Sequence, residues 1–188
     1  MYLIIGLGNP EPEYAKTRHN MGFDVINKIA EKYDIKVDKK GFKSLYGTGI
    51  INNEKVLLVK PQTFMNLSGE AIAEVVNFYK TDLQNVMVIY DDIDIEPGRV
   101  KIRKKGGAGT HNGMKSVIGS LGSDEFIHIR IGTGSPIYKN DLINYVIGKL
   151  SKEEYEVLIR GIEIGLDAVE VILEKGIDKA MNIINIKN

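Results

Sequence analysis

The segment TRHNMGF (residues 17–23) places a histidine immediately before the first expected helix of the chain. Only three histidines occur in the 188 residues. Because a neutral imidazole can accept a proton near neutral pH, His19 is a candidate general base. Taken alone, a histidine near a helix start is more often an exposed polar residue.

A carboxylate that could orient His19 follows a later strand. The apolar run VMVIY (residues 86–90) ends abruptly in Asp91 and Asp92. A carboxylate at the end of a buried strand can hold a histidine in one tautomer and stabilise its cation, as in a catalytic triad. The competing interpretation is that either aspartate caps the following turn, and we expect Asp92 to be solvated.

The first strand runs into GLGNP (residues 6–10), which presents the amide of Asn9. Pro10 restricts Asn9 to extended conformations and so fixes the direction of its amide. The segment is not a dinucleotide fingerprint, because Glu11 stands where the third glycine is required. By itself, Asn9 is better explained as a turn residue.

Two further loops carry amide side chains. In PQTFMNLSG (residues 61–69), Phe64 and Asn66 combine an apolar face with an amide, which is how a site stacks a base or sugar and hydrogen-bonds it. In KKGGAGTHNG (residues 104–113), backbone amides and Asn112 could bind an anion or an oxyanion at a helix start. Ligands of open α/β sheets gather beyond the carboxyl ends of the strands, where these loops are expected. The simpler explanation of the first loop is packing against the core, and that of the second is a flexible crossover.

Five cations fall within seven residues of one expected strand: Arg99, Lys101, Arg103, Lys104 and Lys105. Alternate residues of a strand share one face, so four of these cations would form a row suited to a phosphate backbone. Arg130, on another strand, could join the row. An edge strand protected from aggregation by its charges would have nearly the same pattern.

Two kinds of catalytic site fit the sequence poorly. The three histidines show no metal-binding spacing and the chain has no cysteine, so a metal site is not expected. The sequence has no G-x-S-x-G motif, and Ser68 is expected to cap a helix rather than act as a nucleophile. The remaining residues suit a general base that activates water against an ester or amide in a polar substrate.

The composition indicates an ordinary globular protein. Hydrophobic residues make up 43% of the chain and charged residues 27%, and the 25 basic and 25 acidic side chains cancel. Any attraction to nucleic acid must therefore come from a local patch. The apolar run at the N-terminus is too short for a signal peptide, and no segment approaches the ~20 apolar residues of a membrane span. We expect a soluble cytoplasmic protein.

The elements alternate between strands and helices. Apolar runs and alternating patterns predict strands at 2–7, 45–51, 55–60, 86–90, 99–103 and 126–132, with a hairpin turn at Asn52-Asn53-Glu54 between the second and third of them. Helical spacing predicts helices at 22–33, 68–79 and 113–121, a long helix from a Ser151–Glu154 capping box to Gly176, and a shorter helix through Ala180 and Ile184. The expected fold is a single α/β domain over residues 1–188, with a mixed central β-sheet flanked by helices.

The chain resembles the bacterial-type peptidyl-tRNA hydrolase family from end to end. Four motif blocks over about 130 residues follow the family's order. The segments that carry the resemblance are IIGLGNPEPEYAKTRHNMGF, KPQTFMNLSGEA, YDDIDIEPG and GTHNGMKSVIGSLG followed by FIHIRIGTG. The resemblance implies hydrolysis of the ester that joins a peptide to the terminal ribose of tRNA, which recycles tRNA from prematurely released chains.

The resemblance also implies the roles of individual residues. His19 would be the base, Asp91 would keep it oriented, and Asn9 would help distinguish N-blocked from free aminoacyl-tRNA. Further residues would line the substrate pocket: Tyr14, Phe64, Asn66 and Asn112. Three cations would hold phosphates of the acceptor arm: Lys101, Arg103 and Arg130. The family leads us to expect a metal-independent monomer without a cofactor or membrane partner.

One position departs from the family's usual motif, and further expectations concern the other two histidines, Gly22 and the C-terminal segment. Thr110 replaces a glycine that the family usually has, and it is expected to restrict the loop before Asn112. His111 is expected to be structural, His128 to face outward from an edge-like strand, and Gly22 to let the His19 loop turn into its helix. The segment 177–188 could pack on the body or form a lid over the site.

Two other functions remain possible from the sequence. A non-catalytic RNA-binding relative would keep the basic strand and lose the catalytic set, whereas an unrelated small-molecule hydrolase would use the basic strand only for edge protection. The presence of His19, Asp91, Asn9, Asn66 and Asn112 favours the enzyme.

Overall fold

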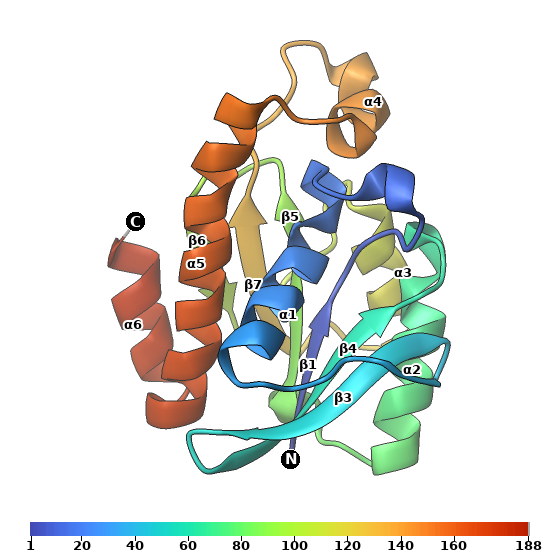
Figure 1. Cartoon of the computed structure of the whole chain (residues 1–188), viewed down its shortest axis with the longest axis vertical. Helices are drawn as coiled ribbons and strands as arrows, with labels where there is room; N and C mark the ends of the chain where they lie inside the picture. The colour runs from blue at the N-terminus through green and yellow to red at the C-terminus, as the bar shows by residue number, and fades with distance from the viewer. Residues whose placement is uncertain (188) are drawn as a thin grey trace.

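The centre of the molecule is a seven-stranded mixed β-sheet with helices on both faces (Figure 1). The computed structural model describes residues 1–187. The strands are β1 (Tyr2–Gly6), β2 (Lys39–Gly41), β3 (Ser44–Ile51), β4 (Glu54–Pro61), β5 (Val86–Asp92), β6 (Val100–Arg103) and β7 (Ile127–Gly132). The helices are α1 (Met21–Lys32), α2 (Ser68–Tyr79), α3 (Asn112–Leu121), α4 (Leu142–Ile147), α5 (Lys152–Lys175) and α6 (Ile177–Lys187). The predicted single α/β domain with a mixed sheet is confirmed.

The strand order β2-β3-β4-β1-β5-β7-β6 places the most apolar strands in the middle. The strands β4, β1, β5 and β7 are mutually parallel, whereas β3 and β6 run antiparallel to their neighbours. Strands covered on both faces need continuous apolar runs, which is why YLIIG and VMVIY could be recognised in the sequence. The carboxyl ends of β1, β5 and β7 therefore meet at one edge of the sheet, beneath α4 (Figure 1).

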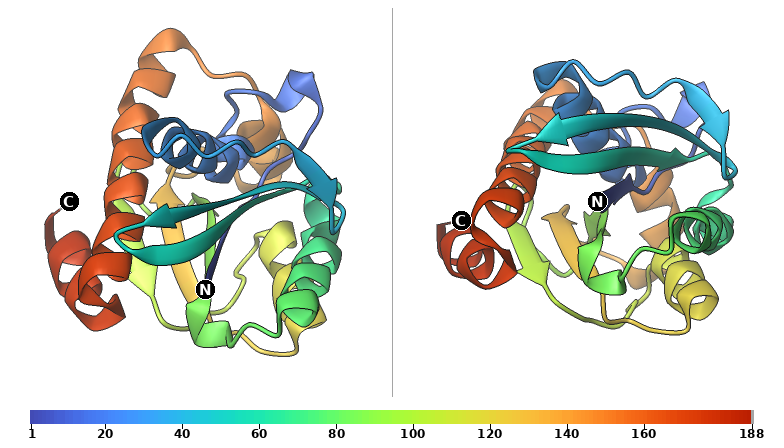
Figure 2. Two further views of the ribbon diagram at one scale, coloured as in Figure 1. Left: turned by 60° about the horizontal axis from the view of Figure 1, so that its bottom comes forward. Right: turned by 90° about the horizontal axis from the view of Figure 1, so that it is seen from below.

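Two apolar cores lie on opposite faces of this sheet. On one face, Ile4 and Ile89 pack against Val25 and Ile26 of α1, and the core continues under α5 and α6. On the other face, Val88 packs among residues of α2 and α3. Figure 2 shows α2 and α3 on one side of the sheet and α1, α5 and α6 on the other.

Several local signals in the sequence acted as predicted. Ser151 accepts a hydrogen bond from the backbone nitrogen of Glu154, and the Glu154 carboxylate accepts one from the Ser151 nitrogen, which completes the capping box of α5. Gly176 ends that helix with φ of 85°. Asn52 and Asn53, both with positive φ, form the two-residue turn between β3 and β4, as in a type I′ hairpin.

Ser68 does not cap α2, contrary to the prediction. It is the first residue of the helix, and its hydroxyl donates to the carbonyl oxygen of Met65 at 2.8 Å. The preceding 3₁₀ turn η3 (Met65–Leu67) already leads the chain into the helix, so no side chain caps it.

The role expected for Gly22 is also corrected. Gly22 lies inside α1 and does not adopt a positive φ. A Cβ atom at this position would collide with the backbone of Leu7 and with the carbonyl oxygen of Ile89. Gly22 is therefore required for the close approach of α1 to β1 and β5, not for a turn.

The C-terminal helix packs on the body of the molecule. In α6, Ala180 and Ile184 are buried in the core that also contains Ile102 of the edge strand β6. The described part of the segment 177–188 therefore covers the edge strand β6 and does not form a lid over the carboxyl ends of the central strands (Figure 1); Asn188 lies outside the described residues.

Candidate active site

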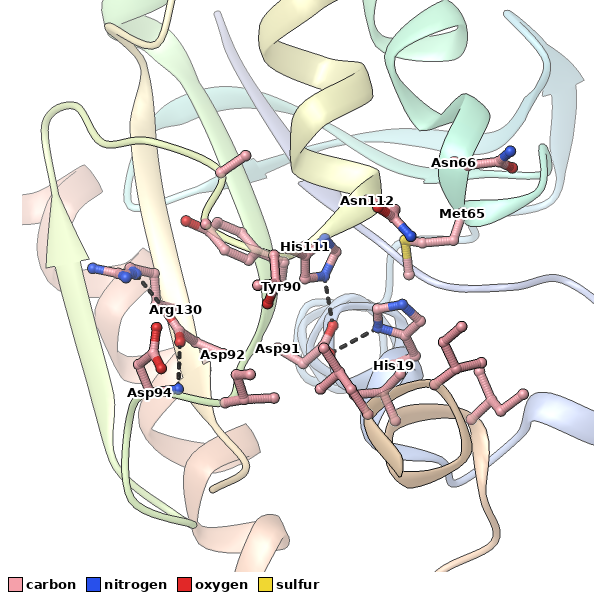
Figure 3. Close-up of a pocket in the computed structure, with 18 of the residues that line it drawn as sticks. His19, Met65, Asn66, Tyr90, Asp91, Asp92, Asp94, His111, Asn112 and Arg130 are labelled. Atoms are coloured by element: carbon pink, nitrogen blue, oxygen red, sulfur yellow. Dashed lines mark hydrogen bonds and ion pairs between the residues drawn. The ribbon is translucent and has the colours of Figure 1, made fainter. Parts of the chain in front are cut away.

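His19 and Asp91 meet at the carboxyl end of the central strands. His19 lies in the 3₁₀ turn η2 (Arg18–Asn20) immediately before α1, and Asp91 lies near the end of β5. The Nδ1 atom of His19 is 2.8 Å from Oδ2 of Asp91 (Figure 3). The Asp91 side chain is only 1% exposed, so this contact is sheltered from water.

The electrostatics of the pair favour a carboxylate beside a basic imidazole. Burial alone would raise the pKa of the Asp91 carboxyl, but the charges of His19 and His111 and the hydrogen bonds from both rings hold that pKa well below its usual range. Burial lowers the pKa of His19, and the charge and hydrogen bond of Asp91 outweigh it, so the His19 pKa lies above 6.5. Since ionised Asp91 can only accept, His19 Nδ1 carries a proton and Nε2 is left as the basic atom.

His111 occupies the other oxygen of the same carboxylate. Its Nε2 lies 2.9 Å from Oδ1 of Asp91, and its Nδ1 accepts a hydrogen bond from the backbone nitrogen of Met114 at 3.1 Å. His111 thus caps α3, which agrees with the expected structural role, but it also belongs to the site. This second contact was not predicted, because no local pattern in the sequence indicates that His111 contacts Asp91.

Both the backbone and the side chain of Asn9 are held by hydrogen bonds with other residues. Its backbone nitrogen donates to Asn20 Oδ1 at 2.8 Å, and its carbonyl oxygen accepts from Asn20 Nδ2 at 2.9 Å. Its side-chain oxygen accepts from the backbone nitrogen of Met65 at 3.0 Å. Because the amide oxygen is engaged, the amide nitrogen is the group that Asn9 can offer to a ligand in the neighbouring cavity.

A cavity of about 280 Å³ opens above the pair. Its lining includes four of the predicted amide and aromatic side chains: Asn9, Phe64, Asn66 and Asn112. The glycine-rich loop contributes Thr110 beside Asn112, and α4 contributes an apolar wall of Leu142, Ile143, Val146 and Ile147. No local pattern in the sequence predicted α4, so this wall was not expected.

One end of the cavity holds a cation that is paired with a carboxylate. Arg130, on β7, lines the cavity, and its Nε donates to Asp92 Oδ2 at 2.6 Å. Asp92 is therefore buried and paired, not solvated as expected. In Figure 3, Arg130 and Asn66 lie on opposite sides of the His19–Asp91 pair.

Asp91 and the two histidines beside it include atoms that could bind a metal. One ligand atom from each of His19, Asp91 and His111 lies within 4.8 Å of the others, among the residues that the structure describes. A metal on His111 Nε2 would need a lone pair there, yet the hydrogen bond from Met114 to Nδ1 keeps the proton on Nε2. Metal binding would break the cap of α3, so the arrangement suits proton transfer better.

The sequence matches the family model described as peptidyl-tRNA hydrolase over residues 3–188. The chain belongs to the peptidyl-tRNA hydrolase family. A relative named peptidyl-tRNA hydrolase from Clostridium novyi (strain NT) is 55% identical over 185 residues, which cover 98% of each chain. One from Clostridium acetobutylicum is 50% identical over 185 residues and 98% of each chain.

The fold agrees with solved members of the family. The crystal structure of peptidyl-tRNA hydrolase from Acinetobacter baumannii superposes with a TM-score of 0.93 at 34% identity, covering 98% of this chain and 94% of that one. The resemblance stated from the motifs is therefore confirmed. None of the helices in the described part of this family member is long and apolar enough to cross a membrane.

Three residues assigned from the family's motifs lie away from the cavity. Tyr14 is in the 3₁₀ turn η1 (Pro12–Tyr14) and is not among the described residues that line the cavity, so its contact with substrate stays a prediction. Lys101 and Arg103 lie on β6, also outside the lining. Lys101 is engaged, since its ammonium donates to the carbonyl oxygen of Asn185 at 2.7 Å, whereas Arg103 is exposed.

His128 is buried, contrary to the prediction that it faces outward. The strand β7 lies between β5 and β6, so it is not an edge. The ring stacks on Phe126 with centroids 4.3 Å apart, and Nδ1 lies 3.0 Å from the hydroxyl of Tyr90, another residue of the cavity wall. Nε2 donates to the carbonyl oxygen of Asp124 at 2.9 Å. His128 thus supports the floor of the cavity.

Proposed function

We propose that this family member hydrolyses the ester bond of peptidyl-tRNA and releases free tRNA and peptide, with His19 as the general base. The observation that carries the proposal is the His19–Asp91 pair, which lies at a cavity with amide side chains on one side and Arg130 on the other. The amide side chains could bind the peptide half of the substrate, and Arg130 could bind a phosphate of the tRNA half. This reaction recycles tRNA from chains that left the ribosome early.

In the proposed reaction, Nε2 of His19 accepts a proton from water as the water oxygen attacks the ester carbonyl carbon. The tetrahedral intermediate then collapses, the bond to the ribose oxygen breaks, and the imidazolium returns the proton to that oxygen. Asp91 stabilises the imidazolium through the Nδ1 hydrogen bond and stays ionised throughout. No metal is required for either proton transfer.

The amide residues Asn9, Asn66 and Asn112 would recognise the peptide. An N-blocked residue offers a carbonyl oxygen next to its α-nitrogen, which the amide nitrogen of Asn9 can bind. A free aminoacyl group instead carries an ammonium, which has only donors and would face another donor. The fixed orientation of Asn9 therefore supports the predicted preference for N-blocked substrates.

The tRNA would approach from the side of Arg130. Arg130 keeps part of its guanidinium available, because only Nε is engaged by Asp92 and its side chain is 28% exposed. Arg103 is exposed on β6 opposite His128, and Lys101, opposite Arg130, would contribute charge more than direct contact. We further propose that the enzyme acts as a monomer in the cytoplasm, where tRNA is used, and that Tyr14 contacts substrate outside the cavity.

The test of this function compares two substrates. Release of tRNA is measured from an N-acetylated aminoacyl-tRNA and from the same aminoacyl-tRNA left unblocked, with and without a chelator. The proposal predicts rapid cleavage of the blocked substrate alone, with no effect of the chelator. Salt-sensitive tRNA binding without cleavage would instead support a non-catalytic RNA-binding relative, which the assembled pair and the family's enzymes disfavour.

A further inference from the structure

The residue immediately before His19 is a buried arginine with partners from distant parts of the chain. The Arg18 side chain is 11% exposed, and its guanidinium lies 3.7 Å from the ring centroid of Tyr145 in α4. Its NH1 donates to the carbonyl oxygen of Tyr145 at 3.1 Å, and its NH2 donates to Glu154 Oε2 at 2.8 Å. One side chain thus joins the His19 turn to α4 and to the start of α5.

The α4 end of this connection is itself anchored to the sheet. The hydroxyl of Tyr145 donates to the carbonyl oxygen of Thr133 at 2.7 Å, and the Thr133 nitrogen donates to the carbonyl oxygen of Asp92 at 3.0 Å. Thr17 also forms an antiparallel backbone bridge with Lys149. The loop that carries His19 and the strand end that carries Asp91 are therefore linked through Tyr145.

His19 is held between two anchored neighbours. On one side, Asn20 clamps the backbone of Asn9, and on the other side Arg18 clamps α4. The same helix presents Val146 and other apolar side chains to the cavity, whereas Arg18 is not among the described residues of its lining. Arg18 can therefore affect the reaction only through the residues that it holds.

We propose that Arg18 is a positioning residue that fixes the His19 turn and the α4 wall in one arrangement, so that the base and the substrate cavity stay aligned. This inference rests on the proposed hydrolysis. The role needs arginine, because a planar guanidinium can stack on Tyr145 while it donates to two different oxygens. A lysine could retain the charge opposite Glu154 but not the stack and both hydrogen bonds.

The first experiment compares Arg18→Lys with the matched control Arg160→Lys, which changes an exposed arginine on α5. Cleavage of N-acetylated aminoacyl-tRNA and thermal unfolding are measured for both. Since misplacing a catalytic group by about 1 Å can cost about 100-fold, we expect kcat of Arg18→Lys to fall by roughly 10- to 100-fold, with KM rising less than about threefold. The control should match the wild type.

A second experiment separates positioning from general stability. In Arg18→Ala, added methylguanidinium should restore kcat at least about fivefold, whereas ethylammonium should not, since only the planar cation can stack and donate in two directions. Wild-type enzyme in the same additive corrects for effects on tRNA. Arg18→Lys and Tyr145→Leu should also combine less than additively in kcat, because both break one connection.

The outcomes are decisive in both directions. A kcat of Arg18→Lys within about twofold of the wild type, or a loss explained entirely by unfolding at the assay temperature and fully recovered at a lower one, would overturn the positioning role. Equal rescue by ethylammonium would show that charge alone suffices and would also overturn it. Failure of the wild type to cleave the blocked substrate would refute the proposed function instead.

Discussion

At the scale of single residues, two histidines bind one carboxylate but differ in what their second ring nitrogen contacts. Both rings donate to Asp91, but the second nitrogen of His111 accepts a backbone hydrogen bond from Met114, whereas the second nitrogen of His19 lies at the cavity without a partner among the described residues. Only His19 can accept a proton without breaking a hydrogen bond. In the proposed reaction, the local geometry, more than residue type, decides which histidine would act as the base.

The substitution Asp91→Asn tests whether Asp91 raises the pKa of His19. Burial lowers the pKa of His19 and Asp91 raises it above 6.5, so removal of the carboxylate should move the His19 pKa below that value. In the wild type, kcat/KM should fall as pH drops through the raised pKa; in the variant this fall should occur at lower pH, with a maximal rate lower by about 10²–10⁴. A pH–rate profile measures both, and an unmoved acid limb would contradict the account.

At the scale of elements, the site depends on how helices attach to the sheet. The helix α1 follows the His19 turn, and it meets α5 at a half-buried carboxyl: the hydroxyl of Tyr155 lies 3.5 Å from Oδ2 of Asp24. Burial raises the pKa of Asp24 to about 6, against weaker lowering by Tyr155, Lys16 and Lys60. This contact therefore makes the packing of α1 sensitive to pH.

The sign of that sensitivity gives a prediction for Asp24→Asn. Between pH 3.8 and about 6, the folded state holds more protons on Asp24 than the unfolded state, so the free energy of unfolding should decrease as pH rises through this window. The variant should lack this decrease and gain about 1–2 kcal/mol at pH 7, a value discounted for partial exposure. Urea unfolding across pH measures it, with Asp38→Asn as an exposed control. A parallel pH dependence of variant and wild type would refute the prediction.

The edge strand β6 is closed by a side chain of α6. The amide of Asn185 accepts from the backbone nitrogen of Ile102 at 2.7 Å and donates to its carbonyl oxygen at 3.0 Å, as a neighbouring strand would. We expect Asn185→Ala to lower the free energy of unfolding by about 1–2 kcal/mol, because both backbone groups lose their partners. Denaturant unfolding beside Asn182→Ala, an exposed neighbour, checks this value; equal stability of the two variants would show that water replaces the amide without cost.

Elements with strong local signals could be predicted, and elements defined by distant partners could not. The run VMVIY, the Asn52–Asn53 turn and the Ser151 cap depend on neighbouring residues, and each appears as expected. The alternation around His128 suggested an exposed face, but exposure depends on strand order, and β7 lies inside the sheet. The helix α4 is only six residues long and has little periodicity of its own, so the apolar wall of the cavity was missed.

The same distinction applies to the site. His19, Asp91 and the amides were identified by their positions after expected strands and by the family's motifs, and the structure brings them together. The second contact of His111 and the anchoring of Arg18 to Tyr145, 127 residues away, depend on tertiary geometry that no local pattern encodes. Their functional roles remain predictions until they are measured.

At the scale of the whole molecule, the chain carries no net charge that would attract tRNA. The 25 basic and 25 acidic residues cancel, and Arg130, which lies on the opposite side of the His19–Asp91 pair from Asn66 (Figure 3), is itself paired with Asp92. Binding of tRNA must therefore come from a few local contacts with phosphates rather than from net charge. The parallel central strands create this arrangement, because they deliver three distant loops to one edge.

Salt dependence tests this view with Arg130→Gln. Each lost phosphate contact should reduce the slope of log affinity against log salt by roughly 0.7–0.9, and the KM for the blocked substrate should rise while the pH profile stays unchanged. The control Arg160→Gln makes the same change in net charge on α5, away from the cavity. Equal slopes for the two variants would contradict a phosphate contact at Arg130.

The central claim is that His19 is the base, and His19→Ala tests it most directly. Single-turnover cleavage of N-acetylated aminoacyl-tRNA is measured at saturating enzyme, together with binding of uncharged tRNA and thermal unfolding. We expect a rate lower by about 10²–10⁴, with tRNA affinity and folding close to those of the wild type. Cleavage within about twofold of the wild-type rate would contradict the assignment of His19.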